Sequence, residues 1–360
     1  MIASRIVHQL PPSYNNPRNS EGSFIRAKNG NILFAYSRYT GTSNHDHATC
    51  DVAMIRSSDE GESWSDLEII ATAAFFGTKN IMSVSAVEQL NGDVAFYFLI
   101  KENDFTTTIG RAVSSDGESF KCERCTANFS PNYYVINNDR FVRLKSGRLI
   151  APASFITAEE NIRNTEQHEH FPFRTTLLYS DDDGASFNAV EWNYTINNKN
   201  SNTVARGLQE PGIIEREDGT LYLWARTGVG CQFESESDGS VECFSEPTWS
   251  AFTAPDSPMQ IKKYDGAYYA VYNPIPLYNG RKYVKGVWGR TPLVIRKSTD
   301  GRAYGDLNII EDDETRGYCY PAIFKANDGN LLLAYCRGNA EDGNTLCRIG
   351  ITKIEISSIN

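Results

Sequence analysis

The stretch from Leu208 to Arg226 carries residue types that can do chemistry, at a spacing that brings them together. It reads LQEPGIIEREDGTLYLWAR, so Glu210 precedes a short apolar strand, a Glu-Asp-Gly turn, a second apolar strand and Arg226. This pattern predicts a β-hairpin with Glu210 and Arg226 near the same end. A carboxylate and a guanidinium on rigid strands suit a site for an anionic substrate, and they equally suit a structural ion pair.

The predicted hairpin belongs to a repeat. An Asn-, Asp- or Ser-Gly turn followed by an apolar strand recurs six times, in most copies with another apolar strand before the turn. The six turn glycines are Gly30, Gly92, Gly147, Gly219, Gly266 and Gly329. Strand pairs at such regular spacing indicate one repeated supersecondary unit.

A second turn motif alternates with the first and is termed here the Asp-box. Its form is Ser-x-Asp-x-Gly-x-Ser/Thr followed by an aromatic residue, and it occurs as SSDEGESW at 57–64 and SDDDGASF at 180–187. Two copies lack one residue, at 114–120 and 298–304, and SESDGS near Asp238 is a degraded copy. Asp and Ser side chains can bond turn amides and Gly supplies positive φ. We therefore expect a structural loop in each case.

Together the two turn motifs predict an all-β protein. Six four-stranded antiparallel units arranged radially form a six-bladed β-propeller, which hides most strand edges. A solenoid or two sandwiches are the alternatives. One repeat family runs along the whole chain without a Pro/Gly/Ser-rich linker, so we expect a single domain over residues 1–360.

Composition excludes several classes of partner. The net charge is -10, so no basic face is available for nucleic acid or an anionic membrane. No apolar run is long enough for a transmembrane helix, and the N-terminus lacks the apolar core of a signal peptide. We expect a cytoplasmic protein, with export of a processed form left open. The sequence does not indicate an oligomeric state.

Cysteine and histidine patterns give weak metal signals. Cys122 and Cys125 form a single CxxC without a second ligand pair, and Cys231 could pair with Cys243 only if the protein is exported. The two histidines that flank Asp46 have no third potential ligand at a sequence spacing typical of metal sites. We predict neither a metal nor a cofactor.

The Asp-boxes and the Glu-Pro hairpin resemble the sialidase (neuraminidase) superfamily of six-bladed propellers. That family uses three arginines, a tyrosine paired with a glutamate, and an aspartate. Glu210-Pro211 and Arg226 match its Glu-Pro hairpin, and Arg290 matches the arginine before an Asp-box strand, with Arg296 as competitor. Tyr320, about nine residues before the last turn glycine, matches the tyrosine, and Tyr318 is second choice.

Two positions match less closely. The family's first arginine lies in an Arg-Ile-Pro motif, which is absent here; Arg18 is the best candidate, because Arg26 lies later, inside the strand. Asp46 best matches the acidic residue, with Asp51 as runner-up. These departures, and the proline after Tyr320, indicate a divergent branch of bacterial type.

The resemblance implies roles for these residues. Three guanidiniums would bind the carboxylate of a terminal acidic sugar. Because a carboxylate nucleophile would repel this anionic sugar, the family uses a tyrosine instead. Tyr320 would be the nucleophile and Glu210 its base, while Asp46 would protonate the leaving oxygen and later activate water. The clamp would consist of Arg18, Arg226 and Arg290.

Further polar residues precede the predicted hairpin strands of other blades. They would contact the glycerol or acyl side of a sugar, or serve only as turn residues. These candidates are Asn80, Asn138, Asp139, Arg140 and Ser257.

The leading functional hypothesis is an exo-acting, retaining glycoside hydrolase that removes a terminal sialic acid or related acidic sugar. One alternative is a propeller hydrolase or lyase that acts on another acidic, uronic glycan. The other is a carbohydrate-binding propeller without catalysis, in which Tyr320 and Glu210 lie beyond hydrogen-bond reach.

Overall fold

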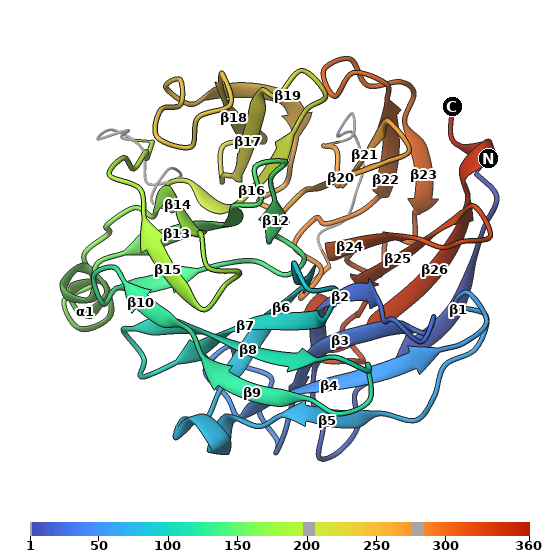
Figure 1. Ribbon diagram of the computed structural model, residues 1–360, viewed down its shortest axis with the longest axis horizontal. Helices are drawn as coiled ribbons and strands as arrows, with labels where there is room; N and C mark the ends of the chain where they lie inside the picture. The colour runs from blue at the N-terminus through green and yellow to red at the C-terminus, as the bar shows by residue number, and fades with distance from the viewer. Residues whose placement is uncertain (1, 197–205, 276–283) are drawn as a thin grey trace.

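The computed structural model describes residues 2–196, 206–275 and 284–360. Six sheets stand around a central axis like the blades of a propeller (Figure 1). The all-β, six-bladed prediction is therefore confirmed, with four-stranded antiparallel blades as the basic unit.

In four blades the strands follow one another in chain order from the axis outward. Blade 1 contains β2 (Asn19–Arg26), β3 (Ile32–Tyr39), β4 (Cys50–Ser57) and β5 (Glu68–Ala71). Blade 2 contains β6 (Ile81–Glu88), β7 (Val94–Lys101), β8 (Thr107–Ser114) and β9 (Lys121–Arg124). Blade 4 contains β16 (Gln209–Glu215), β17 (Leu221–Arg226), β18 (Cys231–Ser237) and β19 (Thr248–Thr253). Blade 5 contains β20 (Gln260–Tyr264), β21 (Ala267–Tyr272), β22 (Leu293–Ser298) and β23 (Asn308–Glu311).

Blade 3 departs from the simple pattern because its inner strand is broken. The pieces β11 (Tyr133–Val135) and β12 (Val142–Arg143) both pair with β13 (Leu149–Ile156), which is followed by β14 (Arg174–Ser180) and β15 (Ser186–Ala189). A short parallel strand, β10 (Thr126–Asn128), extends the outer edge of this blade. The break leaves 136–141 free to fold across the axis.

The last blade joins the two ends of the chain. It contains β24 (Cys319–Lys325), β25 (Asn330–Cys336) and β26 (Ile349–Glu355), and the N-terminal strand β1 (Ser4–Leu10) supplies its outer edge. Ser4 lies opposite Ile354 and Leu10 opposite Ile349 in an antiparallel ladder. In Figure 1 the blue β1 therefore lies beside the red β26. This pairing closes the ring and covers the edge of β26.

Apolar side chains fill the spaces between adjacent blades. One cluster joins Leu33 and Met54 of blade 1 to Phe96 and Phe98 of blade 2, all fully or nearly fully buried. Aromatic and β-branched residues dominate these strands, as expected for sheets buried on both faces. The inner strands are thereby held at fixed positions around the axis.

The Asp-boxes form the structural loops that the sequence predicts. In the first copy, the Ser57 hydroxyl accepts a hydrogen bond from the Gly61 amide at 2.8 Å, and the Asp59 carboxylate accepts one from the Ser63 amide at 2.9 Å. Gly61 has a φ of 85°. The copies at 114–120, 180–187 and 298–304 repeat the same bonds.

Short helices connect some of the strands. The loop expected within 157–174 instead contains the helix α1 (Ala158–Glu166), because Thr157 and Glu160 form a capping box at its first turn. The 3₁₀ segments within the described residues are η1 (Ala73–Phe76), η3 (Thr345–Cys347) and η4 (Ile356–Ser358). Within the described ranges, no helix has the length and apolar character needed to span a membrane.

Candidate active site

A backbone irregularity recurs near the start of the inner strands. In β2, β6, β16 and β24 the strand register shifts at a bulge. A residue with positive φ lies at each bulge: Glu21 (57°), Ser83 (62°), Glu210 (46°) and Tyr320 (56°). All four lie nine residues before a turn glycine. Such backbone conformations cost on the order of 1–3 kcal/mol and concentrate at functional sites.

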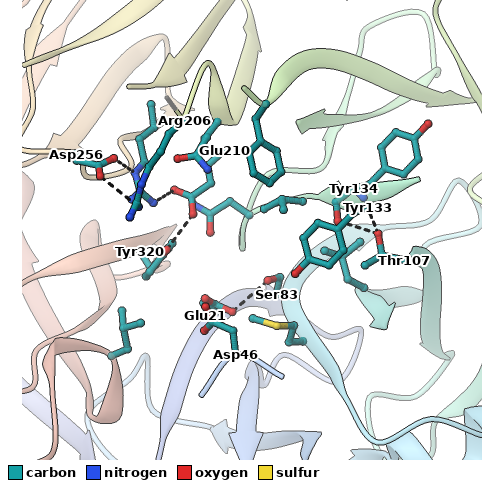
Figure 2. Close-up of a pocket in the computed structure, with 18 of the residues that line it drawn as sticks. Glu21, Asp46, Ser83, Thr107, Tyr133, Tyr134, Arg206, Glu210, Asp256 and Tyr320 are labelled. Atoms are coloured by element: carbon teal, nitrogen blue, oxygen red, sulfur yellow. Dashed lines mark hydrogen bonds and ion pairs between the residues drawn. The ribbon is translucent and has the colours of Figure 1, made fainter. Parts of the chain in front are cut away.

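These four side chains line one cavity of about 540 Å³ on the axis of the propeller. Figure 2 shows Glu21, Ser83, Glu210 and Tyr320 converging on it from different blades. Its wall includes four acidic side chains, Glu21, Asp46, Glu210 and Asp256, and four basic ones, Lys101, Arg206, Arg226 and Arg290. Charges of both signs therefore face a single small volume.

Tyr320 and Glu210 form a direct pair. The Tyr320 hydroxyl donates a hydrogen bond to Glu210 Oε1 at 2.9 Å, and both residues are buried (Figure 2). Burial and the Glu210 charge raise the pKa of Tyr320 well above 10, while Arg226 and Arg290 oppose that rise. The phenol is thus neutral at neutral pH, with an acceptor for its proton already in contact.

Arg226 connects this pair to the next blade. Its Nη1 donates to Glu210 Oε2 at 2.7 Å, and its Nε donates to Asp256 Oδ1 at 2.7 Å. The predicted hairpin-end contact between Glu210 and Arg226 is therefore confirmed. Because Arg226 is buried with two carboxylates, its charge orients both of them.

Arg290 lies over the Tyr320 ring, with its guanidinium carbon 5.7 Å from the ring centroid. It donates to the Asp256 carbonyl at 3.1 Å and to Cys319 Sγ at 3.2 Å. Within the part of the chain that the structure describes, its buried Nε has no hydrogen-bond partner. Arg290 therefore lines the cavity beside the tyrosine with a guanidinium that two hydrogen bonds hold in place.

Asp46 lies at the edge of the cavity, with its side chain 58% exposed. Its carboxylate accepts a hydrogen bond from Arg18 Nη1 at 2.5 Å. Burial of the region opposes ionisation of Asp46, but the Arg18 charge outweighs it and lowers the pKa of Asp46 to about 2. Asp46 is therefore ionised at neutral pH.

Glu21 lies deeper, on the first blade, and its side chain is only 5% exposed. Its two carboxylate oxygens accept hydrogen bonds from Arg18 Nη2 and from the Ser83 hydroxyl, each at 3.1 Å. Burial raises the pKa of Glu21 to about 7 against the attraction of Arg18, and the charges of Asp46 and Glu210 add to the rise.

Arg18 does not line the cavity, which corrects the expected three-arginine clamp. Its side chain is 1% exposed and lies behind Glu21 and Asp46, to which it is ion-paired. Its Nε donates to Ser20 Oγ at 2.9 Å, and its guanidinium carbon lies 4.4 Å from the centroid of the Tyr39 ring. Arg226 also pairs with two carboxylates but lines the cavity, whereas Glu21 and Asp46 separate Arg18 from it.

The predicted site residues of blade 3, Asn138, Asp139 and Arg140, lie outside the cavity wall. Asp139 accepts hydrogen bonds from Ser23 Oγ at 2.7 Å and Gln260 Nε2 at 2.9 Å, and Asn138 donates to the Gly22 and Tyr320 carbonyls. Arg140 is 2% exposed and donates to the Gln260 side chain. These bonds cross the axis between blades, so the segment closes the central channel instead of offering groups to a sugar.

Asn80 and Ser257 also lie outside the cavity wall. The Asn80 amide donates to the Asp46 carbonyl at 3.1 Å and to the Ala48 carbonyl at 2.6 Å, so it supports the loop that carries Asp46. Ser257 is buried and donates to Asn273 at 2.6 Å. The neighbouring Asp256, with a φ of 52°, lines the cavity in its place. The irregularity in blade 5 is therefore offset by one residue from the other blades.

The second-choice residues have other partners. Arg26 pairs with Glu60, and Arg296 donates to the Gly305 carbonyl near an Asp-box. Asp51 accepts a hydrogen bond from the Ala73 amide, and Tyr318 is fully buried in the core between blades 5 and 6. None of these four lines the cavity.

Several cavity residues were not identified from the sequence, most importantly Glu21, Ser83, Asp256, Lys101, Tyr133 and Trp288. The signal for two of them was present. The nine-residue spacing that pointed to Tyr320 also selects Glu21 and Ser83 when it is applied to the first two turn glycines.

No group of three or more His, Cys, Asp or Glu side chains with metal-binding geometry occurs in the described residues. All eight cysteines are free thiols, including Cys231 and Cys243.

The chain belongs to the BNR repeat-like domain family, whose pattern matches residues 23–333. No curated protein matches the chain.

Solved structures share the fold at low sequence identity. The intramolecular trans-sialidase from Ruminococcus gnavus, in complex with oseltamivir carboxylate, has a TM-score of 0.70 and 14% identity, over 98% of this chain and 97% of that one. A protein of unknown function from Dyadobacter fermentans has a TM-score of 0.70 and 16% identity, over 98% and 99%. The Trypanosoma rangeli sialidase with the inhibitor DANA has a TM-score of 0.68 and 13% identity, over 96% and 56%. The shared architecture is the sialidase-like propeller, and fold alone does not define an activity.

Proposed function

We propose that this protein is an exo-acting, retaining glycoside hydrolase that removes a terminal acidic sugar, such as a sialic acid, through a tyrosine nucleophile. The observation that carries the proposal is the 2.9 Å hydrogen bond from the Tyr320 hydroxyl to Glu210 inside an arginine-containing cavity. A nucleophile in contact with its base, and a base oriented by a third group, is the arrangement that covalent catalysis requires.

In the first step, Tyr320 attacks the anomeric carbon while Glu210 takes the phenolic proton. A buried phenol resists ionisation, so the proton transfer and the attack are coupled. Arg226 and Arg290 stabilise the phenolate character that develops, because both charges favour ionisation of Tyr320. A tyrosine also avoids the repulsion that a carboxylate nucleophile would meet from an acidic sugar.

The sugar carboxylate binds at the side of the cavity formed by blades 4 and 5. Arg290 lines the cavity beside Tyr320, and Arg226 lies in the same wall at the end of β17. Guanidinium donors bind carboxylates strongly when the surroundings are largely dry. In this assignment two arginines bind the anion directly.

Asp46 serves as acid and base for the leaving group and for water. Its position at the edge of the cavity suits contact with the aglycone, which leaves toward solvent. Arg18 favours the ionised form of Asp46, which suits the activation of water in the second step. In that step water attacks the anomeric carbon, the bond from the sugar to Tyr320 breaks, and Glu210 returns the proton to the phenolate oxygen. For the first step Asp46 takes up a proton from solvent as the sugar binds, and it delivers that proton to the aglycone oxygen as the bond from this oxygen to the anomeric carbon breaks.

Incubation with fluorogenic α-sialosides and β-glucuronides tests the proposal, with the anomer of the released sugar followed by proton NMR. We expect release with retained configuration. A covalent adduct on Tyr320, trapped with a fluorinated acidic glycosyl fluoride and mapped by mass spectrometry, would support the nucleophile.

Three outcomes would contradict the proposal. They are inversion of configuration, an unsaturated product that absorbs near 230–240 nm, and failure of the folded protein to cleave any acidic glycoside. The absorbing product would instead indicate elimination, as in a lyase.

A further inference from the structure

Glu21 occupies on blade 1 the backbone position that Glu210 and Tyr320 occupy on blades 4 and 6. All three have positive φ at a strand bulge nine residues before a turn glycine. The shared backbone conformation turns each side chain toward the cavity, and Figure 2 shows Glu21 facing the same space as Tyr320. By position, Glu21 is therefore part of the site and not of the blade core.

Glu21 is also held rigidly. Its oxygens accept one bond from Arg18 and one from Ser83, and Ser83 is itself the bulge residue of blade 2. The side chain is 5% exposed, and that exposure is to the cavity. A fixed carboxylate that still reaches the cavity can accept further hydrogen bonds, because each oxygen carries two lone pairs.

The ion pair with Glu21 also keeps Arg18 away from the cavity. Arg18 is shared between Glu21 and Asp46, both of which stand between its guanidinium and the cavity. Blade 1 thus presents two acidic groups where a cation would be needed to bind an anion. Blades 4 and 5 present Arg226 and Arg290 on the other side of the ring.

The depth of the two blade 1 carboxylates separates their roles. Asp46 is 58% exposed at the edge, where an aglycone would pass, whereas Glu21 lines the same cavity with a side chain that is only 5% exposed. Contact with the sugar is accordingly assigned to Glu21, and contact with the leaving group to Asp46.

We propose that Glu21 is a specificity-determining residue that accepts a hydrogen bond from a ring substituent of the acidic sugar. The substituent is a hydroxyl or a protonated amine on the part of the ring that faces blade 1, away from the carboxylate at Arg226 and Arg290. Glu21 correspondingly rejects sugars that place an anion there. This assignment rests on the proposed function for the identity of the ligand as an acidic sugar.

Binding of two acids that share a ring skeleton tests the assignment. N-acetylneuraminate and tetrahydropyran-2-carboxylate both carry a carboxylate on a six-membered ether ring, but only the first has hydroxyls. Their Kd values are measured by NMR titration at pH 8, above the pKa of about 7 of Glu21. The general effect of removing one negative charge cancels in the ratio of the two Kd values.

For the wild type we expect N-acetylneuraminate to bind more tightly. The Glu21→Ala variant should lower this preference at least about tenfold, as expected for the loss of a hydrogen bond to a charged acceptor. Glu21→Gln keeps the shape of the side chain and a neutral acceptor. The preference of this variant for N-acetylneuraminate should therefore lie between those of the wild type and Glu21→Ala. A ratio within twofold of wild type in both variants would overturn the proposal, as would equal binding of the two acids by the wild type.

Glu60→Ala is the matched control. Glu60 also has a φ of 57° and an arginine partner, Arg26, but it lies in an Asp-box turn outside the cavity. Its binding ratio should equal that of wild type. Thermal unfolding of each variant shows whether the fold is kept, and Glu21→Gln tests the assignment if Glu21→Ala does not fold.

The two proposals fail in different ways. If the wild type prefers N-acetylneuraminate through Glu21 but cleaves no acidic glycoside, the proposed function fails and the assignment of Glu21 stands. If acidic glycosides are cleaved with retention but the ratio of the two Kd values is unchanged in the Glu21 variants, only the assignment of Glu21 fails. Absence of N-acetylneuraminate binding by the wild type overturns the assignment directly.

Discussion

The two ends of the propeller blades use repetition in opposite ways. At the Asp-box end, four copies keep a Ser, an Asp and a Gly, and in each copy the Ser and Asp side chains accept hydrogen bonds from turn amides. At the cavity end, four bulges keep the same backbone conformation but carry different side chains, Glu21, Ser83, Glu210 and Tyr320.

This contrast separates structure from function without knowledge of relatives. An Asp-box must satisfy its own turn amides, so its side chains are set by local geometry. A bulge residue is positioned by its backbone, and its side chain is free to differ from blade to blade. A fixed backbone with varied chemistry is what a binding or catalytic site needs. The following changes test this difference.

The largest expected effect is the loss of activity in Tyr320→Phe. Removal of a nucleophile costs roughly 10³-fold or more in kcat. The matched control is Tyr318→Phe, two residues earlier and buried away from the cavity, which should keep activity within a few-fold. Both are measured on a fluorogenic acidic glycoside. Equal activity of the two variants would remove Tyr320 from the mechanism.

Arg226→Met should destabilise the fold as well as inactivate the protein. The change leaves the Glu210 and Asp256 carboxylates without their shared cation, and breaking such a buried pair costs about 3–5 kcal/mol. The free energy of unfolding is measured by urea denaturation. Arg5→Met removes an ion pair whose side chains are 57% and 43% exposed, so it should leave the urea midpoint unchanged.

Ser57→Ala should act only on stability. Ser57 is buried in the first Asp-box and accepts the Gly61 amide while donating to Asp59. Its loss should cost about 1–2 kcal/mol in the free energy of unfolding. Activity should stay within twofold, because the turn lies at the other end of the blade from the cavity. A large loss of activity with unchanged stability would contradict the separation of the two ends.

The smallest effect concerns the titration of Asp59. The Ser63 side chain and amide lower the pKa of Asp59 to about 2, against a value near 3.9 in an unfolded chain. The stabilisation is therefore complete above about pH 4 and is lost as the pH falls toward 2. In Ser63→Ala the pKa of Asp59 should rise, as measured by carboxyl NMR. An unchanged titration midpoint of Asp59 in Ser63→Ala would show that the Ser63 hydroxyl contributes little to the lowered pKa.

Local patterns predict the fold well, and they predict the site less completely. Turn glycines and Asp-boxes specify hairpins through short-range geometry, so the six blades follow from the sequence. The resemblance to the sialidase superfamily implies that Tyr320 and Glu210 form a pair, and the structure brings them into contact. The broken inner strand of blade 3 and the one-residue offset at Asp256 depend on contacts across the axis, which no local pattern contains.

The position of Arg18 shows the same limit. An arginine near an inner strand fits a clamp by residue type, but only the packed structure shows that Glu21 and Asp46 bind it from the cavity side. Whether a buried charge faces a ligand or another side chain is decided by three-dimensional neighbours. The helix α1 differs, because its capping box is visible in the sequence at Thr157 and Glu160.

The pairing of β1 with β26 bears on how the chain folds during synthesis. Ser4 and Ile354 are 350 positions apart, so this contact forms only after nearly all of the chain has left the ribosome. Until then the last blade lacks one strand, and an exposed edge invites pairing with another chain. Moving 4–10 to follow 355 through a short linker would make the contact local. Such a permuted chain should reach the native state faster and aggregate less while it refolds.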